Sequence, residues 1–102
     1  MERFYKMVEA SNKRFPRGVE PYQMVTRLME KCGEVAAEVN LWEDSGVKRM
    51  KHGDPKKEDL ANELRQAICE LFKIAKYYGV EKELEDSIER SLARSRAEGL
   101  IE

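Results

Sequence analysis

The sequence predicts an all-α protein whose four helices assemble into a bundle together with further copies of the chain. Three observations favour this fold class. Apolar residues recur at steps of three and four, Gly and Pro separate the periodic stretches, and no stretch shows the alternation typical of a β-strand. The chain has 102 residues, which suits a single domain spanning residues 1–102.

Pro and Gly bound the first two expected helices. Residues 2–14 form the first, and the segment 15–18 ends it. Pro21 suits the first turn of the second helix, where an N–H would have no partner in any case. This helix is expected to run to about Asp44, just before Gly46. Its apolar stripe, expected to face the core, consists of Val25, Leu28, Cys32, Val35, Val39 and Trp42.

Similar signals bound the last two helices. Asp54 is expected to cap the third helix and Pro55 to open it. This helix runs to Tyr78, and Gly79 supplies a left-handed stop. A fourth helix covers about 81–97. The apolar stripe of the third helix consists of Leu60, Leu64, Ala67, Leu71, Ile74 and Tyr78, and that of the fourth of Leu84, Ile88 and Leu92.

The two long segments 22–44 and 55–78 are expected to form a central antiparallel pair. Helices of this length are longer than a chain of 102 residues easily covers. We therefore expect a homodimer or homotetramer in which the long helices pair across a symmetry axis.

Composition narrows the classes of partner. Charged residues make up 38% of the chain and the net charge is −1, which argues against a protein that binds duplex nucleic acid. No apolar run approaches the ~20 residues that span a membrane, and the first residues lack an apolar signal core, so we expect a cytoplasmic protein. Neither Cys32 nor Cys69 has zinc-type spacing, and both are expected to be small buried apolar side chains.

Glutamates stand beside the apolar stripe of the second helix. Glu30, Glu34 and Glu38 form a ladder of like charges at steps of four, which is mildly destabilising. Lys31 can relieve Glu34, whereas Glu38 has no basic residue three or four positions away in the sequence.

The third helix repeats this pattern. Glu63 and Glu70 share a row with core residues, and Glu63 lacks a basic residue at helical spacing. If the two helices pack side by side, Glu34, Glu38 and Glu63 can share a hard cation, and ligands of oxygen alone favour Mg²⁺ or Mn²⁺. The alternative is a solvated helix flank whose glutamates form ion pairs with lysines of other helices.

At these residues the sequence resembles the MazG-like superfamily of all-α nucleoside triphosphate pyrophosphohydrolases, which includes dimeric dUTPases, dCTP pyrophosphatases and phosphoribosyl-ATP pyrophosphohydrolases. The segment 32–38, Cys-Gly-Glu-Val-Ala-Ala-Glu, resembles the first carboxylate block of that group. The segment 62–66, Asn-Glu-Leu-Arg-Gln, resembles the second, and 59–62, Asp-Leu-Ala-Asn, fits about as well. The resemblance implies that four carboxylates hold Mg²⁺, which binds the phosphates and activates water.

Two positions depart from the pattern of this superfamily. Lys31 stands where the first block has its first Glu, and an amide, Gln66 or Asn62, replaces the Asp of the second block. Glu34, Glu38 and Glu63 remain as the implied catalytic and metal-binding residues. Further metal ligands are expected from Asp59, Gln66 and Glu70.

Several other residues have two interpretations each. Trp42 is a core anchor or stacks on a nucleotide base. Arg90 and Arg94 form ion pairs within the last helix or contact phosphate across a dimer, and Lys31 is a further candidate for substrate binding. His52 and the basic segment 48–57 are read as an exposed linker, with contact to a triphosphate as the alternative.

Three functions follow. The first is a Mg²⁺-dependent pyrophosphohydrolase that converts a nucleoside triphosphate into a monophosphate and pyrophosphate. The second is a catalytically degenerate homologue that binds a nucleotide or a protein. The third is a plain helical oligomerisation module whose acidic stripe is only a surface.

Overall fold

The computed structural model describes residues 1–43 and 54–102, and these residues form helices and connecting segments without a β-strand. The helices are α1 (Glu2–Arg14), α2 (Pro21–Trp42), α4 (Lys57–Tyr78) and α5 (Glu81–Ala97). The predicted all-α class is confirmed. In the part of the chain that the structure describes, none of the helices combines the length and apolar content needed to cross a bilayer.

Local sequence signals set most helix ends. Pro21 is the first residue of α2, and Gly79 caps α4 in the left-handed conformation at φ 65°. The predicted start of α4 was wrong, because Asp54 and Pro55 precede the helix and Lys56 is its extended N-cap. Glu58 and Asp59 instead occupy the first turn, where negative charge favours the helix dipole.

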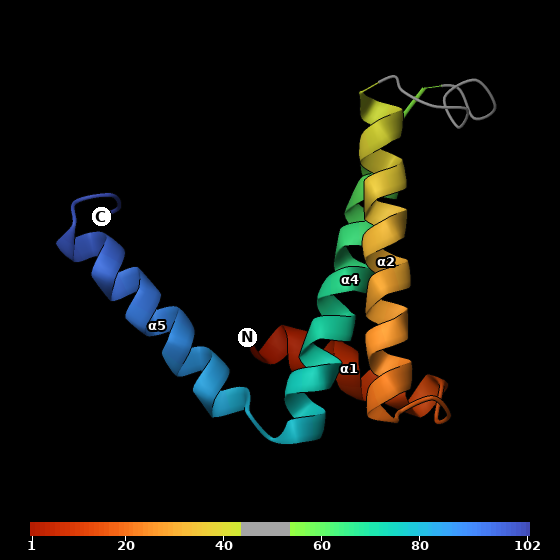
Figure 1. The fold of residues 1–102 in the computed structure, drawn as a ribbon, viewed down its shortest axis with the longest axis horizontal. Helices are drawn as coiled ribbons and strands as arrows, with labels where there is room; N and C mark the ends of the chain where they lie inside the picture. Colours follow the sequence, from red (N-terminus) through yellow and green to blue (C-terminus); the bar gives the residue numbers. More distant parts are fainter. Residues whose placement is uncertain (44–53) are drawn as a thin grey trace.

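The helices pack around α4. Figure 1 shows α2 and α4 side by side, with the start of α2 near the end of α4, while α1 crosses that end of the pair. The rings of Phe4 and Tyr5 on α1 lie 4.9 and 5.0 Å from the ring of Phe72 on α4, centroid to centroid. Val8 of α1 is completely buried. Among the described helices, α5 contacts α4 alone and extends away from the others (Figure 1).

The apolar core of the single chain is small. Among the described residues, the buried apolar ones are Val8, Met24, Leu41, Cys69 and Ala75, and α5 buries none of its residues. The expectation that the stripes of the two long helices face inward holds only in part. Large apolar side chains that were expected inside remain exposed, namely Val25, Val39, Trp42, Leu64, Leu71 and Tyr78. The contact between α2 and α4 therefore covers only part of each stripe.

The two cysteines differ. Cys69 is buried between α1 and α4, as predicted, but Cys32 is exposed, so that prediction was wrong. Burial raises the pKa of the Cys69 thiol, and the charge of Glu70 acts in the same direction. Lys73, Arg65 and a hydrogen bond with Ser11 oppose this shift.

Candidate functional site

Two of the predicted glutamates meet across the long helices. Glu34 of α2 and Glu63 of α4 are joined by a hydrogen bond between their carboxyl groups. Two ionised carboxylates have no proton to share, so this hydrogen bond requires a proton on one member of the pair. The packing of α2 on α4 thus brings together residues that lie 29 positions apart in the printed sequence.

The pKa of Glu63 is raised above the ordinary value for glutamate. The hydrogen bond with Glu34 is the largest cause, followed by burial and by the negative charge of Glu34. The charge of Glu38 raises this pKa as well, while Lys31 lowers it. The raised pKa makes Glu63 easier to protonate than an ordinary glutamate, and a protonated Glu63 donates a hydrogen bond to the carboxylate of Glu34.

Lys31 is the cation nearest to this pair in the α2 sequence. Its Nζ lies 3.3 Å from Oε2 of Glu34, one helical turn away, and the Lys31 side chain is 27% exposed. This ammonium group stands at the position where the resemblance expects a carboxylate. It offsets part of the negative charge of Glu34 and of Glu38 nearby.

Glu38 lies next to the pair but deeper. It is 7% exposed, and its negative charge contributes to the raised pKa of Glu63. Residues 1–43 and 54–102 contain no group of three or more His, Cys, Asp or Glu side chains arranged to hold a metal ion. The cluster is thus a hydrogen-bonded pair of carboxyl groups with a third carboxylate nearby, and the shared metal shell stays a prediction.

The other predicted ligands differ in their surroundings. Asp59 is exposed in the first turn of α4, and Gln66 is half-buried. Glu70 is buried and pairs with the equally buried Lys73, Nζ to Oε1 at 3.2 Å. Because Lys73 already neutralises it, Glu70 belongs to a separate ion pair one turn or more beyond the Glu34–Glu63 pair. Its Oε2 is buried without a hydrogen-bond partner in the described structure.

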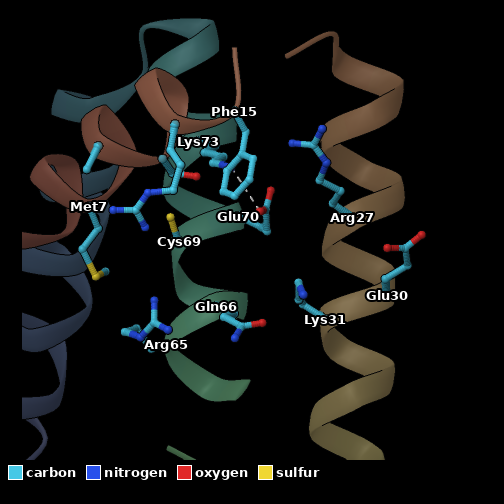
Figure 2. A pocket seen from close by; sticks show the side chains of 13 residues that line it. Met7, Phe15, Arg27, Glu30, Lys31, Arg65, Gln66, Cys69, Glu70 and Lys73 are labelled. Atoms are coloured by element: carbon cyan, nitrogen blue, oxygen red, sulfur yellow. Dashed lines mark hydrogen bonds and ion pairs between the residues drawn. The ribbon is translucent and has the colours of Figure 1, made fainter. Parts of the chain in front are cut away.

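A pocket of about 660 Å³ opens beside these groups, between α1, α2 and α4. Figure 2 shows Arg27 and Lys31 extending from α2 toward α4, while Gln66 points back from α4. Phe15, at the end of α1, lies over the region of Glu70 in the same view. Met7, Phe15 and Cys69 supply apolar wall, so the pocket combines charged and apolar lining.

The remaining candidates lie elsewhere. Trp42 ends α2 and is 38% exposed. Arg90 and Arg94 are exposed on α5, which extends away from the pocket, and Nε of Arg94 pairs with Glu98 at 3.0 Å. Arg90 forms no ion pair among the described residues, and Asp86, one turn before it, pairs with Lys82 at 3.1 Å. His52 and residues 48–53 of the basic segment lie outside the described residues.

Sequence reasoning missed the basic lining of the pocket. Arg14, Arg27, Arg65 and Lys73 were not singled out, although each lines it. Only Lys73 carried a local signal, since a lysine within the apolar run 71–75, one turn after Glu70, indicates a buried ion pair.

Comparisons of the chain with family models, with curated proteins and with solved structures found no match. The fold and the site alone define the class here, which is an all-helical protein with a paired-carboxylate cluster beside a basic pocket.

Proposed function

We propose that the chain is a MazG-like, Mg²⁺-dependent nucleoside triphosphate pyrophosphohydrolase, in which Glu34, Glu38 and Glu63 hold the metal. The observation that carries this proposal is the hydrogen-bonded pair of Glu34 and Glu63 on facing helices. Two like carboxyl groups held together with a raised pKa are typical of a functional site rather than of a solvated flank.

The residues fit a hard cation in two respects. The donors are all carboxylate oxygens, which Mg²⁺ and Mn²⁺ prefer. In addition, Oε2 of Glu63 is buried and has no hydrogen-bond partner among the described residues. When bound, Mg²⁺ neutralises phosphate charge and lowers the pKa of a water molecule. Glu34, Glu38 and Glu63 would hold the ion, and Glu63 would have to be deprotonated to serve as a ligand. Beyond these three carboxylates, the amide oxygen of Gln66 or the carboxylate of Asp59 would supply a further ligand.

The assay is pyrophosphate release from a panel of nucleoside triphosphates with Mg²⁺ or Mn²⁺. We expect release by the wild-type chain and a loss of about 100-fold or more in Glu34→Gln, because one anionic ligand disappears. Glu89→Gln, an exposed change on α5, is the control and should keep full activity. Failure of the wild-type chain with every nucleotide would remove the catalytic proposal.

A second candidate function is a catalytically degenerate homologue that binds a nucleotide or a protein through its helices. Lys31 favours it, because its ammonium group pairs with Glu34 at 3.3 Å and competes with a metal ion for that carboxylate. The neutral amide of Gln66 is also a weaker ligand than the carboxylate expected there. Binding of a nucleotide without turnover would distinguish this candidate from the enzyme.

We further propose that the chain works as a homodimer or homotetramer with the antiparallel α2 and α4 at its centre. The radius of gyration is 16.7 Å, against about 13 Å for a compact domain of this length. The accessible surface is 7835 Å², whereas a folded monomer of this mass exposes roughly 5,900 Å². If each protomer buried that excess, a dimer interface would total roughly 3,800 Å², within the range of obligate homodimers.

The exposed apolar residues support a position for such an interface along α4 and α2. Leu64, Leu71 and Tyr78 recur every seven residues along α4 and are 44, 52 and 59% exposed, which is the spacing of a seam for another helix. Met29 of α2 is 65% exposed as well. These residues would cover one another between protomers.

Light scattering at micromolar concentration is expected to give two or four times the chain mass of 11.9 kDa. Leu71→Glu should shift the protein toward the monomer, because a charge in an apolar seam costs several kcal/mol unless it is paired. Leu100→Glu is the matched control on a highly exposed residue near the end of the chain and should leave the mass unchanged. A wild-type protein that stays monomeric would contradict the proposal.

A further inference from the structure

The pocket between α1, α2 and α4 concentrates positive charge. The whole chain carries 19 Lys and Arg against 20 Asp and Glu, yet five basic and only two acidic residues line this pocket. They are Arg14, Arg27, Lys31, Arg65 and Lys73, against Glu30 and Glu70. An excess of one sign in a concave site focuses the electrostatic potential and attracts ions of the opposite sign.

Two of the five cations already have a carboxylate partner. Lys73 pairs with Glu70 at 3.2 Å, and Lys31 pairs with Glu34 at 3.3 Å. Glu30 does not neutralise the other three basic residues. Figure 2 shows its side chain pointing away from the gap into which Arg27 extends.

Three guanidinium groups therefore remain without a counter-ion in the described structure. Arg27 donates from Nη2 to the carbonyl oxygen of Arg17 at 3.2 Å, which orients the side chain without neutralising it. Arg14 on α1 and Arg65 on α4 form no ion pair within the described ranges, and both line the pocket. The charge of Arg65 acts on Cys69 in the pocket wall, where it opposes the rise that burial causes in the pKa of the thiol.

Guanidinium groups without a counter-ion suit one class of ligand best. Their planar donors match the oxygens of phosphate groups, often with two parallel hydrogen bonds. The volume of about 660 Å³ lies within the range for small-molecule sites. Phe15 is 58% exposed at this pocket, so an apolar surface is available beside the charges.

We propose that this pocket binds a phosphate-bearing small molecule directly, through Arg14, Arg27 and Arg65, without a bridging metal ion. The site goes beyond the proposed pyrophosphohydrolase, because it requires neither magnesium at the carboxylates nor turnover. Lys31 connects the pocket with the carboxylate cluster, since it lines the pocket and pairs with Glu34 of that cluster.

The test is calorimetric titration of the full chain with inorganic pyrophosphate at neutral pH, with EDTA present. We expect binding by the wild-type chain and about a tenfold loss of affinity in Arg65→Gln, because one charge-assisted contact disappears. The double variant with Arg14→Gln should lose more. Arg3→Gln is the matched control: Arg3 is also exposed and lies on α1, but it does not line the pocket. It should bind as the wild type does.

Three results would overturn the proposal. The first is that the wild-type chain binds pyrophosphate only when Mg²⁺ replaces EDTA, which would assign the phosphate to the metal of the carboxylate cluster instead. The second is that Arg65→Gln and Arg3→Gln weaken binding equally, and the third is that a polyglutamate peptide binds as tightly as pyrophosphate. Each of these last two would point to non-specific charge. Binding in EDTA by a chain with no pyrophosphohydrolase activity would support this inference while removing the proposed function.

Discussion

Replacing Glu63 by glutamine is expected to stabilise the protein at neutral and alkaline pH and to change little at acid pH. In the folded chain the pKa of Glu63 is raised, chiefly by its hydrogen bond with Glu34. Between the ordinary pKa of glutamate, 4.5, and the raised value, the unfolded chain releases a proton that the folded chain keeps. Stability therefore falls as pH rises through this window, and the loss is complete above the folded pKa.

The glutamine variant removes this loss. Its amide has almost the same shape, carries no charge and can donate an N–H to the carboxylate of Glu34. We expect a gain on the order of 1 kcal/mol above the window, which raises the Tm by about 4–8 °C for a domain of this size. Thermal melts in metal-free buffer from about pH 4 to about pH 8 measure it.

Glu89→Gln on α5 serves as the control for the loss of one negative charge, because Glu89 is exposed and distant from the pair. Its Tm difference from the wild type should not grow with pH. If Glu63→Gln instead destabilises the protein equally at all pH values, Glu63 is ionised in the folded state and the hydrogen-bonded pair is wrong. The same variant should lose Mg²⁺ binding, because an amide replaces a central anionic ligand.

The double variant Lys31→Glu with Gln66→Asp is expected to strengthen Mg²⁺ binding most. It removes an ammonium group that pairs with Glu34 at 3.3 Å and adds two carboxylates beside the cluster. Affinity for a hard cation rises with the number of anionic ligands, so we expect at least about a tenfold gain, or about 1.4 kcal/mol. Gln66→Asp alone should give a smaller gain and should raise any pyrophosphohydrolase rate.

Calorimetry with MgCl₂ measures the affinity, and Gln66→Asn is the control, because it shortens the side chain to the length of Asp without adding charge. The double variant should also melt lower than the wild type in EDTA, since its carboxylates repel one another, and recover when Mg²⁺ binds the folded state. Unchanged affinity in both Gln66→Asp and the double variant would place these positions outside a metal site. The helical binding module would then be the better account.

Local sequence signals determined the class of fold and most helix ends. The helix over 2–14, the start at Pro21 and the stop at Gly79 all agree with the structure, because caps, Pro and Gly act through their own backbone and its nearest neighbours. The start of α4 was the exception. Asp54 and Pro55 allow a helix to begin, but they do not require it, and the first turn lies at Glu58 and Asp59.

The sequence also determined which residues to examine at the candidate site. Glu34, Glu38 and Glu63 were marked by their place beside an apolar stripe, and Glu38 and Glu63 also by the lack of a basic partner at helical spacing. Only the packing of α2 on α4 decided that Glu34 and Glu63 come within hydrogen-bonding distance, which raises the pKa of Glu63. Periodicity gives angles within one helix, whereas the distance between two helices depends on how each is rotated about its own axis.

The tertiary structure alone decided which faces are buried and where charge gathers. Glu38, Glu70 and Lys73 are buried, while Val25 and Leu71 of the apolar stripes are about half exposed. A helical pattern shows that an apolar face exists, but it does not show whether the same chain or another copy covers that face. The basic pocket arises in the same way, because its arginines come from three helices and none of those segments is strongly basic by itself.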